Sequence, residues 1–284
     1  MQRMIDMSHF DFDAVVKIGS MALLRPEDND LDYNRFARLG ADLRPGMILV
    51  TSGATEIGRI DYMRRNGSEL RGDIEEIKSD YAAQGQSILM QLYRQYIPTQ
   101  YSIRQVLVEH SHFNDPEKAE HIRRLLYRAA NQSAIPIINY NDAVSSEENR
   151  KLEIMALKKE NSDAHIVECV DNDETAAVIT KLVGTEKMII LTSTEGIYRD
   201  PSDPSTLIET VVGTDADDIN AKIDKMMRYC SGTSREGSGG AAAKLQYAKD
   251  ALTLGTTVMI AHARHRLSDI IAGRVPCTVL RVEN

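Results

Sequence analysis

Short, continuous apolar runs alternate with helix-forming segments along most of the chain, and this alternation limits the folds that the chain can adopt. The runs span residues 14–18, 47–51, 104–109, 135–139, 187–191, 257–261 and 277–282. Continuous apolar character is typical of strands that are buried on both faces of a parallel sheet. The alternation therefore predicts an α/β fold, in which helices cover both faces of a mainly parallel sheet.

The segments between these runs have the apolar spacing or the start signals of helices. The predicted helices span residues 29–43, 73–96, 116–132, 174–183, 217–229, 241–253 and 268–273, and one more begins at residue 52. Leu31, Phe36 and Leu39 are the expected core contacts of the first helix. Gly85 is expected to break the long helical region. The strongly charged segment 145–162 is interpreted as an inserted, helix-prone arm.

Length and composition exclude several classes of protein. A chain of 284 residues fits one large α/β domain, or two lobes that share a sheet. The net charge of −8 argues against a general nucleic-acid-binding surface. No apolar run approaches the roughly 20 residues of a membrane-spanning helix, and residues 1–12 are too polar for a signal peptide. The widely spaced Cys169, Cys230 and Cys277 suit reduced thiols, so we expect a cytoplasmic protein.

Small or hydrogen-bonding residues directly follow several of the predicted strands. They are Gly19-Ser20, Ser52-Gly53, residues 139–142 and Thr192-Ser193. The carboxyl ends of parallel strands share one edge of a sheet, and ligands bind at that edge. These residues therefore predict one site rather than unrelated turns.

A glycine-rich stretch, residues 237–244, opens a good helix former and ends at Lys244. Glycines let backbone N–H groups turn outward, and a helix N-terminus adds partial positive charge, so the stretch has the features of a phosphate cradle. Its spacing is not that of a P-loop, and it fits the dinucleotide fingerprint only in part. A mobile loop that caps an ordinary helix is the alternative.

Two lysines and an aspartate are expected at the same edge of the sheet. Lys17, within the first strand, would be costly to bury without a partner, unless it extends to the rim. Lys244 lies one turn inside a helix and can reach back toward a bound anion. Asp173, at the start of a helix, is placed to hold both ammonium groups. Its alternative role is an N-terminal cap, which is also open to Asp171 and Asn172.

Two pairs of histidines, His110/His112 and His262/His265, have the close spacing of metal ligands. Neither pair is accompanied by a cluster of carboxylates or cysteines. We therefore expect surface or core histidines and predict no metal ligand.

A series of motifs occurs in the order seen in the glutamate 5-kinases of the amino acid kinase superfamily. The motifs are VVKIGS (15–20), VTSGA (50–54), GQS (85–87), PIINYNDAV (136–144), DND (171–173), ILTSTEGIY (190–198) and GSGGAAAKLQ (237–246). Each is weakly specific alone, but together they make residues 14–263 resemble that family. The resemblance implies a three-layer αβα sandwich, with an acid-substrate lobe at about residues 1–170 and a nucleotide lobe at about 171–284.

The resemblance also implies a role for individual residues. Lys17 and Lys244 are expected to stabilise phosphate charge, and Asp173 is expected to orient both lysines. The expected glutamate contacts are Ser52, Gly53, Asp142 and Asn172. The expected nucleotide contacts are Lys17, Gly19, Thr192, Ser193, Ser238, Gly239, Gly240, Ala241, Ala242, Ala243 and Lys244.

The implied reaction is the ATP-dependent phosphorylation of the γ-carboxylate of L-glutamate, the first step of proline biosynthesis. A carboxylate is already anionic at neutral pH, so its attack needs positive charge and positioning rather than a general base. Mg²⁺ is expected to be held by phosphate oxygens and water. A homo-oligomer with small-molecule ligands, and without nucleic-acid or membrane partners, is expected. The C-terminal PUA domain of many relatives is not expected in this chain.

Several residues depart from the family pattern, mainly around the acid substrate. Tyr140 stands where the family has Glu, Val170 where it has Gly, and Ser193 where it has Asp. Met21 replaces a small polar residue, and the charged segment 145–168 is longer than expected. Two alternatives therefore stay open: a family kinase acting on another small carboxylate or phosphate, and a nucleotide-binding paralogue without turnover.

Overall fold

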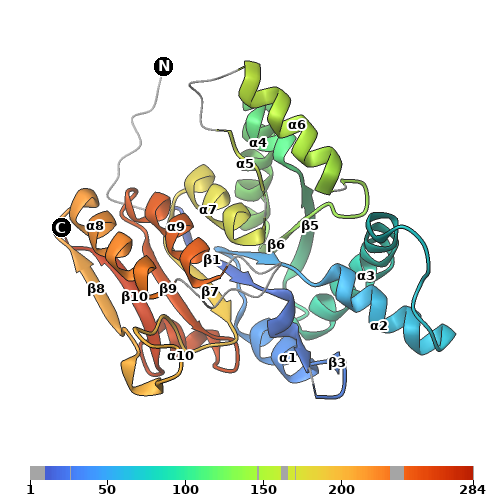
Figure 1. Cartoon of the computed structure of the whole chain (residues 1–284), viewed down its shortest axis with the longest axis horizontal. Coiled ribbons are helices and arrows are strands. Elements are labelled where there is room, and N and C mark those ends of the chain that lie inside the picture. Colours follow the sequence, from blue (N-terminus) through green and yellow to red (C-terminus); the bar gives the residue numbers. More distant parts are fainter. Residues whose placement is uncertain are drawn as a thin grey trace.

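One large sheet forms the middle layer of the protein (Figure 1). The computed structural model describes residues 10–25, 27–145, 147–160, 166–169, 171–230 and 240–283. In this part of the chain, eight strands form the sheet in the order β5-β6-β4-β1-β7-β9-β10-β8. They are β1 (Phe12–Ile18), β4 (Met47–Thr51), β5 (Ser102–Val108), β6 (Ala134–Tyr140), β7 (Thr185–Thr192), β8 (Thr210–Gly213), β9 (Thr257–His262) and β10 (Cys277–Val282). A separate ribbon pairs β2 (Leu24–Arg25) with β3 (Asp30–Leu31).

The strands that carry the expected site are parallel neighbours. β1 pairs with β4 on one side and with β7 on the other, and β4 in turn pairs with β6. β5 and β9 extend this parallel set at its two ends. β10 runs antiparallel to β9, and β8 is parallel to β10. The carboxyl ends of β6, β4, β1 and β7 therefore lie side by side at one edge of the sheet.

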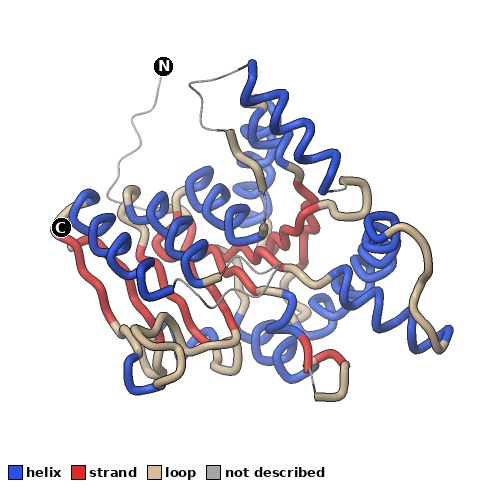
Figure 2. Tube along the Cα trace, viewed as in Figure 1, coloured by secondary structure: helices blue, strands red, loops and turns tan. Residues whose placement is uncertain are grey.

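Helices cover both faces of this sheet, as Figure 2 shows. One face packs against α1 (Tyr33–Asp42), α2 (Ala54–Asn66), α3 (Ile74–Tyr96) and α10 (Leu267–Ile271). The other packs against α5 (Pro116–Asn131), α7 (Asn172–Val183), α8 (Ala216–Met227) and α9 (Ala241–Leu252). The strands other than β8 contribute to both apolar cores because successive side chains point to opposite faces; Val15 and Val16 of β1 show this division. The predicted three-layer αβα fold is confirmed.

The helix boundaries follow ordinary capping chemistry. Aspartates accept hydrogen bonds from the first-turn backbone N–H groups of α1, α3, α5, α7 and α8, which satisfies donors that have no partner within the helix. Pro116 opens α5, where its missing N–H costs nothing. The apolar runs became strands within one or two residues of the predicted bounds. Neither β8 nor the short helix α4 (His110–Asn114) was predicted, and Leu31 is buried in β3 rather than in the first helix.

The predicted break at Gly85 is wrong, because α3 is one continuous helix through this residue. Gly85 instead lies where α3 crosses Gly58 of α2. A Cβ at Gly85 would meet the carbonyl oxygen of Ala54 at 1.8 Å, and one at Gly58 would meet that of Tyr81 at 1.8 Å. The two glycines let the helix backbones touch, and this contact outweighs the modest cost of glycine within a helix.

The charged arm does form a helix, α6 (Glu147–Glu160), which lies outside the two main helix layers and close to α4 (Figure 1). Ile154 is its buried apolar anchor, whereas Leu152 and Met155 are exposed. Among the described residues, no helix combines the length and the apolar character that a bilayer crossing requires.

Candidate active site

Three charged residues from three elements meet at the carboxyl edge of the sheet. Lys17 Nζ lies 2.6 Å from Asp173 Oδ1, and Lys244 Nζ lies 2.9 Å from Asp173 Oδ2. All three are largely removed from solvent, with side-chain exposures of 9% for Lys17, 15% for Lys244 and 2% for Asp173. One buried carboxylate therefore holds two ammonium groups side by side.

The fold places these residues by simple means. Lys17 is the penultimate residue of β1, the strand between β4 and β7. Asp173 is the second residue of α7, and Lys244 lies in the first turn of α9. Because α7 and α9 pack side by side over the same face, their N-terminal ends bring Asp173 and Lys244 to the end of β1.

Electrostatics keep Asp173 ionised. Burial alone would raise its pKa, but the two lysines outweigh burial and hold the pKa of Asp173 below its usual value. The neighbouring Asp171 is the N-cap of α7, accepting hydrogen bonds from Asp173 N at 2.8 Å and Glu174 N at 3.0 Å. Burial and the nearby Asp173 raise the pKa of Asp171. The cap role belongs to Asp171, which leaves the side chain of Asp173 to the lysines.

A chain of side-chain amides runs from this cluster across the ends of the neighbouring strands. Asn172 Nδ2 donates to Ser52 Oγ at 2.9 Å and to Asn139 Oδ1 at 3.1 Å. Asn139 Nδ2 donates to Gln86 Oε1 at 2.9 Å. This amide chain links the end of β4, the end of β6, the start of α7 and the middle of α3.

One backbone hydrogen bond determines the orientation of the three side-chain amides in this hydrogen-bonded series, those of Asn172, Asn139 and Gln86. The N–H of Tyr140 donates to Asn139 Oδ1 at 2.9 Å, so this atom of Asn139 must be the oxygen. The atom of Asn172 that faces it must then be the NH₂ group, and the atom of Gln86 that faces Asn139 Nδ2 must be the oxygen. Asn172 Oδ1 and Gln86 Nε2 remain, and both are buried without a partner in the described part of the chain.

Comparison with known proteins identifies the kind of molecule that carries this arrangement. The amino acid kinase family profile matches residues 14–262. The chain belongs to the amino acid kinase family. It is therefore a phosphotransferase of this family, as the sequence motifs had indicated.

Two relatives and two solved structures show how similar this chain is to other kinases. It is 29% identical to the glutamate 5-kinase of Geobacillus thermodenitrificans over 94% of this chain and 67% of that protein. It is 32% identical to that of Proteus mirabilis over 76% of this chain and 52% of that protein. Carbamate kinase from Giardia lamblia bound to AMP-PNP has 12% identity and a TM-score of 0.57, covering 96% of this chain and 99% of that chain. The isopentenyl phosphate kinase of T. acidophilum has 13% identity and a TM-score of 0.51, covering 95% and 100%.

Two glycines of this amino acid kinase line the approach to the lysine cluster. Gly53 has a φ of 100°, a left-handed conformation that favours glycine, and it directly precedes α2. A Cβ there would lie 3.7 Å from Ser20 Cα, so the ends of β1 and β4 approach closely. A Cβ at Gly19 would lie 3.5 Å from Lys17 Nζ. Both expected glycines therefore lie next to the edge that carries Lys17.

Asp142 lies beyond the end of β6, in a setting unlike that of Asp173. Burial raises its pKa to about 6, and the neighbouring carboxylate of Glu56 adds to this rise, whereas Arg150 opposes it. Glu56 lies in the first turn of α2. Asp142 is thus a half-buried acid near a second acid, and its charge is only partly offset by a cation.

The expected nucleotide contacts are only partly described. Thr192 ends β7, beside His262 of β9, and its carbonyl oxygen accepts from Ala263 N at 2.8 Å. Ser193, the residue that follows the end of β7, is exposed. Gly240 precedes α9, and residues 241–243 form its first turn with Lys244. Ser238 and Gly239, like Val170, lie outside the described residues.

The paired histidines serve structural contacts. His265 Nε2 lies 2.6 Å from Glu195 Oε2, and His262 lies beside it with ring centroids 6.4 Å apart. His110 is buried, and its Nε2 lies 2.9 Å from Glu153 Oε2 of α6. His112 Nδ1 accepts from the backbone N–H of Glu109. Within the described ranges, no group of three or more His, Cys, Asp or Glu side chains could hold a metal ion.

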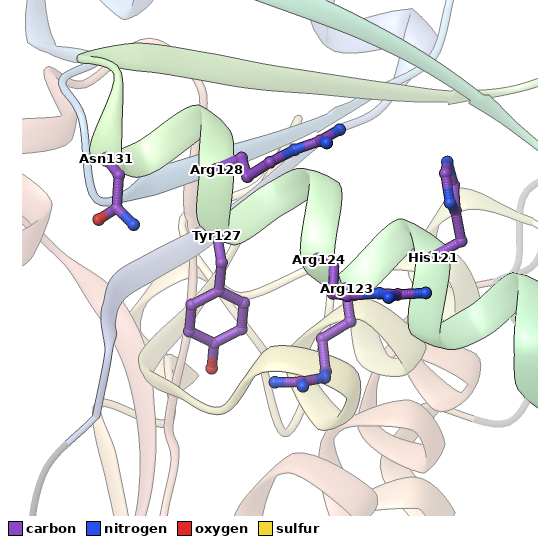
Figure 3. Close-up of a pocket in the computed structure, with 6 residues that line it drawn as sticks. All are labelled: His121, Arg123, Arg124, Tyr127, Arg128 and Asn131. Carbon is purple, nitrogen blue, oxygen red and sulfur yellow. The ribbon is translucent and has the colours of Figure 1, made fainter.

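A pocket on α5 contains none of the site residues (Figure 3). It is lined by His121, Arg123, Arg124, Tyr127, Arg128 and Asn131. Arg123 already pairs with Glu120 and lies 5.2 Å from the centroid of the Tyr127 ring. The pocket therefore belongs to the outer surface of one helix.

Gln86 and Arg150, which contact Asn139 and Tyr140 of β6, were not predicted as site residues. Gln86 belongs to a short motif already noted, GQS at 85–87, but nothing in the motif showed that its amide would meet Asn139. Arg150 lies in the arm, whose position depends on the contact of Glu153 with His110 and on the burial of Ile154.

Proposed function

We propose that this amino acid kinase transfers the γ-phosphoryl group of ATP to the γ-carboxylate of L-glutamate, forming glutamyl 5-phosphate. The observation that carries the proposal is the pair of lysines held by Asp173 at the same strand edge as the amide chain. The curated relatives named glutamate 5-kinase support the choice of acceptor.

The protein itself forms no covalent bond in this reaction. A carboxylate oxygen of the acceptor attacks the γ-phosphorus, the bond from that phosphorus to the β,γ-bridging oxygen breaks, and ADP leaves. No proton is transferred, so no general base is needed. The barrier comes from bringing two anions together and from charge on the transferring group. Lys17 and Lys244 supply positive charge there, and Asp173 fixes their positions before substrate arrives.

The amide chain and Asp142 form the acceptor end of the proposed site, and their polar groups suit the two charges of an amino acid. Asn172 Oδ1 is an acceptor that can bind an ammonium group, and Gln86 Nε2 is a donor that can bind a carboxylate. Burying either atom without a partner costs about 1–3 kcal/mol, which a bound ligand would recover. The carboxylate of Asp142, when ionised, is a second partner for the ammonium group.

The nucleotide belongs, in this proposal, to the second lobe of the chain, residues 171–284, with Thr192, Ser193 and the N-terminal turn of α9 as contacts. The first lobe, residues 1–170, would bind the acid. Mg²⁺ would supply further positive charge between phosphate oxygens. Both oxygens of Asp173 face ammonium groups, so the ion would be held through the nucleotide rather than by this carboxylate.

A second candidate is a kinase of the same family that acts on a different small acid. Tyr140 and helix α6 both lie at the acceptor end, where the chain departs from the glutamate 5-kinase pattern. The lysine cluster would serve such a reaction equally well, because it acts on the phosphoryl group.

The test is ADP release with Mg-ATP across a panel of L-glutamate, N-acetylglutamate, aspartate, carbamate and UMP, with hydroxylamine to trap any acyl phosphate as its hydroxamate. We expect ADP release and γ-glutamyl hydroxamate with L-glutamate. Turnover with UMP alone, or with no member of the panel, would overturn the proposal. Turnover with another acid would select the second candidate.

A further inference from the structure

Helix α6 and the segment that follows it are held against the short helix α4. His110 Nε2 contacts Glu153 Oε2 at 2.9 Å, and Ile154 is buried. Beyond the helix, Asn114 Nδ2 donates to the carbonyl oxygen of Val167 at 2.7 Å, and its Oδ1 accepts from Val167 N at 2.9 Å. The arm is therefore packed against the domain.

Arg150, near the start of α6, touches both segments that carry acceptor contacts. Its Nη1 donates to the carbonyl oxygen of Cys169 at 3.1 Å, two residues before the cap of α7. Its guanidinium lies 5.3 Å from the centroid of the Tyr140 ring, two residues before Asp142. Arg150 also opposes the rise in the pKa of Asp142, so its charge is felt at that carboxylate.

Tyr140 supports the guanidinium without neutralising it. A glutamate at this position, as in the family pattern, would place a carboxylate next to Arg150, whereas the ring of Tyr140 attracts the cation through its electron-rich face. The Tyr140 hydroxyl is in turn held by Ser145 Oγ at 2.9 Å. Among the side chains that the structure describes, no carboxylate forms an ion pair with Arg150.

We propose that Arg150 binds a second carboxylate of the acceptor acid, so that α6 makes the site selective for dicarboxylic acids. The inference rests on the proposed function and deepens it. One carboxylate of the acceptor faces the lysine pair, where the phosphoryl group arrives. The other faces a planar guanidinium whose geometry matches a carboxylate. Between them, Asn172 Oδ1 and Asp142 receive an ammonium group if the acid carries one.

The rival explanation is that Arg150 only anchors the arm through Cys169. The two explanations differ in what they predict for an acceptor without the second carboxylate. If Arg150 binds that carboxylate, its removal weakens only acids that carry the group. If Arg150 is an anchor, its removal disturbs the site for every acid equally.

The experiment compares Arg150→Met with the wild type on L-glutamate and on 4-aminobutanoate, which lacks the α-carboxylate. We expect kcat/KM for glutamate to fall about 50-fold, as for loss of a charged hydrogen bond. The value for 4-aminobutanoate should change less than about twofold. Arg150→Lys should recover part of the loss. Lys159→Met, an exposed cation on the same helix, is the matched control and should leave both values unchanged.

Calorimetric dissociation constants of the two ligands give the same comparison without turnover. An equal loss for both ligands, or no loss for glutamate, would overturn the role of Arg150 while leaving the proposed function intact. If the wild type phosphorylates aspartate or N-acetylglutamate instead, the same comparison with that acid and its decarboxylated analogue decides the proposal. Turnover only with acids that carry one carboxylate would overturn it.

Discussion

The two ends of the site differ in how far their polar groups are satisfied by the protein itself. At the lysine cluster, both oxygens of Asp173 are paired with ammonium groups: Oδ1 forms an ion pair with Lys17 at 2.6 Å without hydrogen-bond geometry, and Oδ2 accepts a hydrogen bond from Lys244 at 2.9 Å. At the amide chain, Asn172 Oδ1 and Gln86 Nε2 are buried without a partner in the described residues. Asp142 adds a carboxylate that burial drives toward its neutral form.

In the proposed function, this difference separates the groups that stabilise the transferring phosphoryl group from the groups that recognise the acid. Groups that already have their partners cost nothing to reorganise when the phosphoryl group is transferred, which is the condition for electrostatic catalysis. Groups without partners are destabilising until a ligand completes them, which ties their energy to binding. Changes at the cluster should therefore affect turnover, and changes at the amide chain should affect the affinity for the acid.

The largest effect is expected from Asp173→Asn. It leaves Lys17 and Lys244 close together without a counter-charge, so we expect turnover to fall about 1,000-fold and the free energy of unfolding to fall by about 3–5 kcal/mol. Kinetics and urea denaturation measure the two quantities. Glu283→Gln, which removes the exposed ion pair with Arg281, is the control and should cost less than about 1 kcal/mol. Wild-type turnover in Asp173→Asn would refute the role of the cluster.

An intermediate effect is expected from Asp142→Asn, because Asp142 must be ionised to bind an ammonium group. With a pKa of about 6, kcat/KM for glutamate should rise as pH increases through 6 in the wild type. In the variant this rise should disappear, and kcat/KM at pH 7.5 should be about 100-fold lower. An unchanged pH profile in the variant would assign the titration to another group.

The same substitution should have the opposite effect on stability. Because the folded pKa of Asp142 is raised, the folded protein retains a proton between about pH 4 and 6 that the unfolded chain has lost. Wild-type stability therefore falls as pH rises through this window. Asp142→Asn avoids that loss and should be about 2–3 kcal/mol more stable than the wild type at pH 7.5, but nearly equal at pH 4.

The smallest effect is expected from Gln86→Ala. It removes one donor from the acceptor end and leaves Asn139 Nδ2 without its partner, so the KM for glutamate should rise about 10-fold. The kcat should change less than about threefold, since the lysine cluster is untouched. Ser87→Ala, on the exposed side of the same helix turn, is the control. A fall in kcat with constant KM would show that the amide chain affects turnover rather than the affinity for the acid.

The sequence predicted the cluster better than the amide chain, for a physical reason. Strand ends and helix starts are local features, so Lys17, Asp173 and Lys244 could be assigned to one edge before the fold was known. The amide chain depends on which atom each side chain turns toward its neighbour, and the N–H of Tyr140 decides this only in the folded protein.

Tertiary packing also explains where the fold differs from the predictions made from the sequence. Gly85 resembles a helix breaker, but its lack of a side chain is used where α3 touches α2. The short β8 (Thr210–Gly213) is placed at the sheet edge by its pairing with β10. The position of the charged arm could not be predicted from its composition, because α6 is held by the contact with His110 and by the burial of Ile154.

The steady-state kinetics of Lys244→Ala, as a function of glutamate concentration, show whether the lysine cluster acts on phosphoryl transfer rather than on binding of the acid. The substitution leaves Asp173 paired with Lys17, so the fold should be retained. We expect kcat to fall about 100- to 1,000-fold while the KM for glutamate stays within about threefold. A raised KM with an unchanged kcat, or turnover near that of the wild type, would show that Lys244 does not act on the transferring phosphoryl group.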